Sequence, residues 1–148
     1  MIFLKRGLTA ILFVVALASC APSGSQQSAP ATTSRDALDA VPQLSGGFTG
    51  FNDHLVSGNA VLATGSDGRQ LLVFDQAFRF DGSPKPGIVL IYASGFELRL
   101  APLQSNSGRQ VYLLPIIGGS ETGSVKSVKI EDWQFDVLLA LAELEEVS

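Results

Sequence analysis

The sequence predicts an all-β domain, an antiparallel β-sandwich or barrel of about seven to eight short strands. Three observations indicate this fold class. Short apolar runs rich in β-branched and aromatic residues recur along residues 54–144, and turn-forming residues bound each run. Gly65-Ser66-Asp67-Gly68 is the strongest hairpin signal, because Gly and Asp tolerate positive φ. The chain of 148 residues has a single cysteine, so packing rather than disulfides must stabilise the core.

The expected strands follow one another from His54, and each ends at a turn or loop. Gly58 lies inside the first strand and indicates a bulge or a close approach of two backbone segments. The Gly- and Pro-rich stretch 81–87 and the Gly-rich stretch 118–123 are expected to be loops. The strand ranges are 54–64, 69–75, 88–92, 98–103, 110–115, 125–130 and 134–144.

The last of these ranges is ambiguous, because residues 138–144 also have good helix propensity. Phe135, Val137, Leu139 and Leu141 alternate with other residues, which suits a strand buried on one face. We therefore expect a strand, with a helix as the alternative.

The first 19 residues resemble a lipoprotein signal peptide. They begin with a short positive region and continue with an apolar run, residues 8–18, that is shorter than the roughly 20 residues a spanning helix needs. Leu17, Ala18 and Ser19 before Cys20 resemble the lipobox of bacterial lipoproteins. We expect cleavage before Cys20 and lipidation of its thiol with palmitate-type chains. The alternative is an ordinary secreted protein with a chance cysteine near its cleavage site.

Lipidation of Cys20 would leave the mature protein without any thiol for a disulfide, a nucleophile or a metal ligand. Residues 20–45 are then expected to be the lipidated cysteine and a flexible tether rich in Ala, Ser, Pro and Thr, in which residues 36–44 have room for one weak helical turn. Residues 46–148 are expected to form one domain. The residue after the cysteine is Ala21 rather than Asp, and by resemblance to lipoprotein sorting in two-membrane bacteria this favours the outer membrane, with the domain facing the periplasm or the cell surface.

The charge of the chain argues against nucleic acid as a partner. The full sequence has 10 basic and 14 acidic residues and a net charge of −4. Removal of Lys5 and Arg6 with the signal leaves 8 basic against 14 acidic residues, a net charge of −6. Nucleic-acid-binding domains carry the opposite sign, concentrated in a basic patch.

A series of mostly apolar and Gly positions extends over nearly all of the domain: Gly47-Phe48, His54, 57–60, 71–78, 87–94, Leu103, 108–112, Leu114-Pro115, 127–130, Phe135, Val137, Ala142 and Leu144. In order and spacing these residues resemble a DM-thirteen domain, a small all-β module found beside DOMON domains in animals and alone in bacterial lipoproteins. The Pro-Asp of the family's central strand is missing here.

One position departs from the family in a way that bears on function. The family usually has a cysteine just after the Ser-Val-x-Ile strand, proposed to take part in redox chemistry. Asp132, beside Trp133, stands at that position here. An aspartate cannot alternate between thiol and disulfide, so the resemblance implies a redox or haem-linked accessory role only as an alternative.

Three residues are candidate ligand contacts: His54, Asp132 and Trp133. His54 is the only histidine and the one side chain that titrates near neutrality, but we expect it to be a hydrogen-bonded structural residue rather than a catalytic or haem-binding one. For Asp132 and Trp133 we expect a solvated turn in which the indole covers the rim of the core.

The remaining acidic residues predict no metal site. Asp75, Asp81 and Glu97 flank turns, but they lack the dense acidic loop that calcium usually requires. No Ser nucleophile motif or phosphate-binding loop is present, so we expect no enzyme activity and no cofactor, with haem only under the alternative. The sequence thus predicts an envelope lipoprotein anchored to a membrane through Cys20. Its β domain would bind an envelope protein or a surface ligand.

Overall fold

The computed structural model describes residues 39–117 and 122–148, and these ranges contain strands and no helix. The strands are β1 Val41–Gly50, β2 Val56–Ser57, β3 Asn59–Thr64, β4 Gln70–Phe74, β5 Arg79–Phe80, β6 Pro86–Tyr92, β7 Glu97–Pro102, β8 Gln110–Leu113, β9 Val125–Asp132, β10 Val137–Glu143 and β11 Glu145–Glu146.

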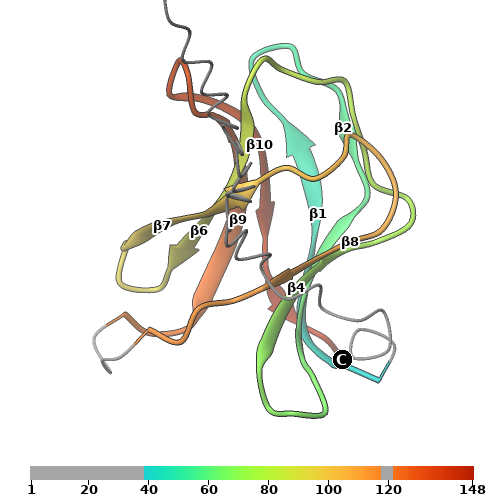
Figure 1. Ribbon diagram of the computed structural model, residues 1–148, viewed down its shortest axis with the longest axis vertical. Coiled ribbons are helices and arrows are strands. Elements are labelled where there is room, and N and C mark those ends of the chain that lie inside the picture. Colours follow the sequence, from blue (N-terminus) through green and yellow to red (C-terminus); the bar gives the residue numbers. More distant parts are fainter. Residues whose placement is uncertain (1–38, 118–121) are drawn as a thin grey trace, which may run out of the picture.

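Nearly all of these strands belong to one antiparallel sheet that curls around the core (Figure 1). The strand order is β7-β6-β9-β10-β1-β3-β4-β8, and β11 pairs with the first half of β1. A separate small sheet joins β2 to β5. The predicted all-β fold, an antiparallel barrel or sandwich, is therefore confirmed.

Each expected strand range contains a strand of the structure. The ambiguous last range is strand β10 rather than a helix, as the alternation of its apolar residues predicted. The Gly65–Gly68 turn joins β3 to β4, and Gly68 has φ +81°. Gly58 has φ +94°, and a Cβ at this position would collide with the backbone of Phe78, so the predicted close approach is also confirmed.

The first strand was not predicted correctly. β1 begins at Val41, inside the range expected to be tether with a weak helical turn, so the ordered strand starts five residues before the predicted domain boundary. β1 pairs with β3 on one side and with β10 and β11 on the other. Gly46 is required there, because a Cβ would overlap the carbonyl oxygen of Glu143. Inter-strand hydrogen bonds therefore maintain a strand whose own residues have weak strand propensity.

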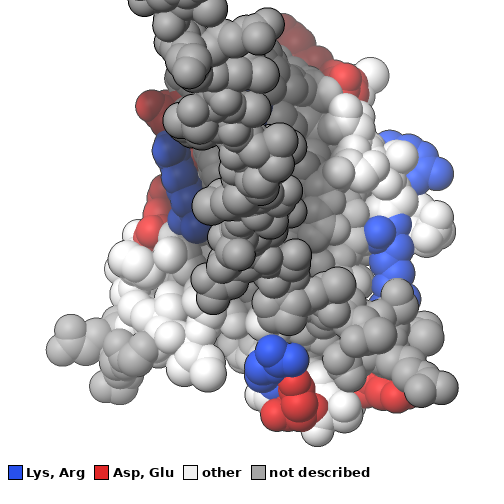
Figure 2. Space-filling model, in the orientation of Figure 1, with Lys and Arg blue, Asp and Glu red and all other residues white. Residues whose placement is uncertain are grey.

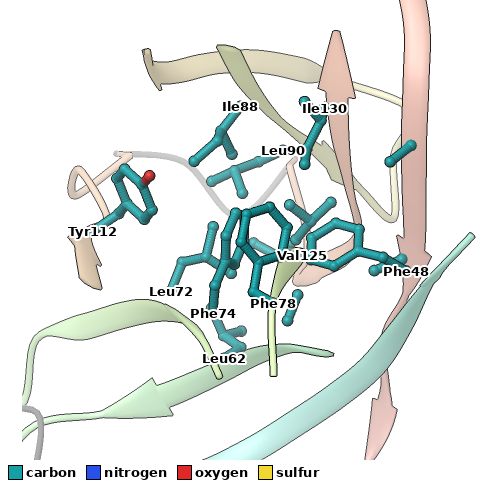
Figure 3. Packing of buried hydrophobic residues seen from close by; sticks show 14 of the residues in the cluster. Phe48, Leu62, Leu72, Phe74, Phe78, Ile88, Leu90, Tyr112, Val125 and Ile130 are labelled. Carbon is teal, nitrogen blue, oxygen red and sulfur yellow. The ribbon is translucent and has the colours of Figure 1, made fainter. Parts of the chain in front are cut away.

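Alternating side chains of the curled sheet fill a core rich in aromatic rings (Figure 3). The ring centroids of Phe48 and Phe74 are 4.9 Å apart in an edge-to-face arrangement, and those of Phe74 and Phe78 are 4.8 Å apart. Tyr112 closes the cluster, with its centroid 5.6 Å from that of Phe74. Such pairs add about 0.5–1.5 kcal/mol each beyond the area they bury.

The outer face of β6, β7 and β9 carries a ladder of charged side chains. Lys129 Nζ lies 2.8 Å from a carboxylate oxygen of Glu97 and 3.3 Å from one of Glu131. Val89 lies between Lys129 and Arg99 in the strand register and is only 1 % exposed, because these long side chains flank it. Figure 2 shows basic and acidic side chains next to one another on the face it views.

Candidate functional site

A pocket of about 270 Å³ opens where the loop after β5 meets the turn between β9 and β10. Its polar residues are His54, Ser83 and Asp132, and Phe135 and Leu139 are among its apolar residues. Two of the three candidate ligand contacts, His54 and Asp132, thus line one pocket although they are far apart in the sequence. This end of the domain is opposite the β3–β4 and β6–β7 turns, as the antiparallel register requires.

His54 is positioned by Asp81. The Nδ1 atom of His54 lies 2.8 Å from Oδ1 of Asp81, and the backbone N–H of Leu55 donates to Oδ2 at 2.9 Å. These two contacts, the Leu55 N–H first and the imidazole second, lower the pKa of Asp81 below its usual value. Since Asp81 is therefore ionised near neutrality, Nδ1 carries the proton of the pair. The imidazole also packs beside Phe80, with ring centroids 5.7 Å apart.

Asp132 is the last residue of β9 and is 2 % exposed, so the expectation of a solvated turn is wrong for this residue. Its Oδ1 accepts hydrogen bonds from the N–H groups of Gln134 (2.8 Å) and Phe135 (3.2 Å). Its Oδ2 accepts one from the N–H of Lys85 at 3.3 Å. The turn and the Ser83–Lys85 loop thus fold over the carboxylate. Backbone N–H groups thereby take the place of the water that would hydrate it.

The charge on Asp132 is retained despite its burial. Burial by itself opposes ionisation, but the N–H of Gln134, the nearby Ser83 hydroxyl and the N–H groups of Lys85 and Phe135 outweigh it and lower the pKa of Asp132. Within residues 39–117 and 122–148 the carboxylate forms no ion pair with Lys or Arg. The pocket therefore contains a negative charge that no described side chain neutralises.

The Ser83 hydroxyl is the other unusual polar group of the pocket. Its oxygen is buried and lies near Asp132, but within the described part of the chain it makes no hydrogen bond of ordinary geometry. A buried hydroxyl with no hydrogen bond of ordinary geometry is uncommon in folded proteins, since incomplete compensation for its desolvation costs about 1–3 kcal/mol. A donor that entered the pocket would satisfy it.

Trp133 does not join this pocket. Successive residues of a strand point to opposite faces, so the indole lies on the outer side of the sheet, in contact with Gly87. The Arg99 guanidinium stacks over it, with Cζ 5.5 Å from the ring centroid. The indole Nε1 atom is buried and has no hydrogen-bond partner among the described residues. The structure thus separates Trp133 from His54 and Asp132.

The other acidic candidates also lie apart. Asp75 accepts a hydrogen bond from Asn59, Asp81 contacts His54, and Glu97 contacts Lys129. Among the described residues, no group of three or more His, Cys, Asp or Glu side chains could hold a metal ion.

Sequence reasoning missed two parts of the site. It did not single out Ser83, and it considered Asp81 only as a calcium ligand rather than as the partner of His54. The contacts join residues 27 and 47 positions apart, so no local pattern could have indicated them.

Cys20, the lipobox residues Leu17, Ala18 and Ser19, and residues 20–38 of the expected tether lie outside the described residues, as does most of the 118–123 loop. In the parts of the chain that the structure describes, no helix is long and apolar enough to cross a membrane. Comparison of the chain with protein-family models, with curated proteins and with solved structures finds no match.

Proposed function

We propose that this protein is a membrane-anchored envelope lipoprotein whose β domain binds a protein or surface component without catalysing a reaction. The observation that carries the proposal is the pocket in which His54, Ser83 and Asp132 converge beside exposed apolar side chains. Concave sites with an apolar wall and a few convergent polar groups are the usual form of binding sites.

The rim of the pocket supports a role in contact with another molecule. Phe135 is 60 % exposed, and Leu55, the neighbour of His54, is 77 % exposed. Phe51 is also exposed and is connected to the pocket wall by a hydrogen bond from its N–H to the carbonyl of Leu139. Exposed aromatic and aliphatic side chains gathered around a pocket are typical of interaction sites.

The anchor is proposed from the sequence alone. The lipobox-like residues 17–20 place Cys20 ahead of the tether and the domain. If Cys20 is acylated, the change Cys20→Ala should release the protein from the membrane fraction, whereas Ser25→Ala should leave it there. Membrane retention of the Cys20→Ala protein would contradict the anchor. Mass spectrometry of the N-terminal peptide measures the acylation directly.

Site-specific photo-crosslinking tests the binding role. The full chain is expressed in its native host with a photoreactive phenylalanine analogue in place of Phe135. Phe96, which is also exposed, is the matched control because it lies in the β6–β7 turn at the opposite end of the domain. We expect a discrete crosslinked product from position 135 and none from position 96. Equal or absent crosslinking at the two positions would refute binding at this pocket.

The alternative, a redox or haem-linked accessory domain, depends on the resemblance to DM-thirteen domains. Asp132 replaces the family's cysteine, and its carboxylate is engaged by backbone N–H groups, so thiol chemistry has no group to use here. Addition of haem to the purified full chain separates the two functions. A Soret band that His54→Ala abolishes would favour the alternative over the binding role proposed above.

A further inference from the structure

The charge and shape of the His54–Asp132 pocket restrict the chemistry of its ligand, and this inference rests on the proposed function. Lys85 donates its backbone N–H to the Asp132 carboxylate. The side chain of Lys85 forms no ion pair within the described chain. Among the residues that the structure describes, no Lys or Arg lines the pocket. An anionic ligand would therefore approach a buried negative charge with no described cation to offset it, which is unfavourable in a site of reduced dielectric.

The size of the pocket favours a small group. Its volume of about 270 Å³ is below the roughly 300–1,000 Å³ that is typical of sites for drug-sized molecules. A single aliphatic chain or one amino-acid side chain fits this range. Phe135, Val137 and Leu139 provide an apolar wall for such a chain, while Ser83 and Asp132 provide the polar lining.

We propose that the pocket binds an alkylammonium group. The ammonium nitrogen faces Asp132 and donates a hydrogen bond to the buried Ser83 oxygen, and the aliphatic stem packs on Phe135 and Leu139. This arrangement neutralises the buried carboxylate and satisfies the buried oxygen in one step. Two sources carry this chemistry: a lysine side chain of a partner protein and a free aliphatic amine.

Binding measured by NMR titration of the full chain in detergent tests this proposal. The probes are n-hexylamine, its neutral analogue n-hexanol and its anionic analogue hexanoate. We expect hexylamine to shift the amide signals of Lys85, Gln134 and Phe135, and to bind about tenfold more tightly than hexanol. Hexanoate is expected to bind more weakly than either. Equal affinity for hexylamine and hexanol, or no saturable shift with hexylamine, would overturn the proposal.

Variants locate the contact. Asp132→Asn is expected to weaken hexylamine binding about tenfold without weakening hexanol binding, and Asp67→Asn in the β3–β4 turn is the matched control. If Asp132→Asn fails to fold, Ser83→Ala provides the same test, because it removes the proposed acceptor while the carboxylate remains. Unchanged hexylamine affinity in a folded Asp132→Asn or Ser83→Ala protein would contradict the assignment.

A second pair of probes separates the two sources. Nα-acetyl-lysine-methylamide presents the free lysine ammonium, and its Nε-acetylated form presents a neutral amide. Preference for the first over hexylamine indicates a partner's lysine, and the reverse order indicates a free amine. Crosslinking at Phe135 that hexylamine does not compete would show that the binding role holds while the ligand class is wrong. Absence of any crosslink at position 135 when no amine is added would refute the proposed function.

Discussion

The phenolic oxygen of Tyr112 lies 2.6 Å from Oε1 of Gln110, and both side chains are buried. The phenol donates to this amide oxygen and accepts a hydrogen bond from the N–H of Gln104 at 3.0 Å. The amide of Gln110 also holds Ser105, accepting from its N–H at 3.1 Å and donating to its carbonyl at 2.8 Å. One network of side chains therefore fastens the loop between β7 and β8, the two strands at the edges of the sheet.

Replacement of Tyr112 by Phe should destabilise the domain by about 1–3 kcal/mol, because it leaves the N–H of Gln104 without its acceptor and removes a donor from Gln110. Urea unfolding followed by circular dichroism measures the change. Tyr92→Phe is the matched control, since Tyr92 is the only other tyrosine and the Gln104–Gln110 network is formed by Tyr112 alone. An equal loss in both variants would show that the network contributes nothing.

The same phenol predicts loss of stability in alkaline solution. Burial raises the pKa of Tyr112 to about 12, against a small opposing effect of the Gln104 N–H. The folded state thus retains a proton on Tyr112 that the unfolded state loses near pH 10. The contribution of the protonated phenol to stability is therefore complete below about pH 10 and is lost as pH rises through about 12.

Denaturant titrations from pH 8 to 12 test this dependence. The free energy of unfolding should fall by on the order of 2 kcal/mol more in the wild type than in Tyr112→Phe. Burial opposes the charge of Lys129, but Glu97 and Glu131 outweigh burial and raise its pKa. Lys129 therefore adds an alkaline decline in the free energy of unfolding that is the same in both proteins. Parallel curves for the two proteins would contradict the assignment to Tyr112.

Gly87 is expected to tolerate no side chain, because a Cβ there would overlap the indole of Trp133. Gly87→Ala should cost about 1–3 kcal/mol, the usual range for overpacking, and should shift the emission of the single tryptophan. Gly47→Ala in β1 is the control, since its Cβ would meet only Asn59 Oδ1 at 3.5 Å, an ordinary contact. Unchanged emission in Gly87→Ala would show that the indole does not lie on this glycine.

Local patterns in the sequence were sufficient for most strands. The hairpin at Gly65–Gly68 follows from residues that tolerate positive φ, and β10 follows from the alternation of Val137, Leu139 and Leu141. β1 could not be predicted in this way, because Pro42 and Gly46 have low strand propensity. The strand forms through pairing with β3 and β10, partners that the local sequence does not reveal.

The candidate site shows the same limit. His54 was singled out because it is the only histidine, and Asp132 because of its place in a family pattern. Their common pocket depends on the loop after β5, whose Ser83 and Lys85 meet Asp132 across 47 or more positions of sequence. Asp132 in its local sequence looks like a solvated turn residue, and only this non-local contact buries it.

Asp132 also predicts how the pocket responds to substitution and acid. Asp132→Ala should destabilise the domain clearly more than Asp136→Asn, a control that keeps a residue tolerant of the positive φ of 52° at position 136. The first change leaves the N–H groups of Lys85, Gln134 and Phe135 without their acceptor, whereas Asp136 makes an exposed ion pair with Arg99.

Because the pKa of Asp132 is lowered, the contribution of its carboxylate to stability is present above the usual aspartate value of about 3.9 and is lost as pH falls through the lowered pKa. Thermal unfolding from pH 7 to pH 2 should therefore show a steeper acid decline in the wild type than in Asp132→Asn. If the decline is equally steep in both proteins, the carboxylate is not held in its ionised form by the turn.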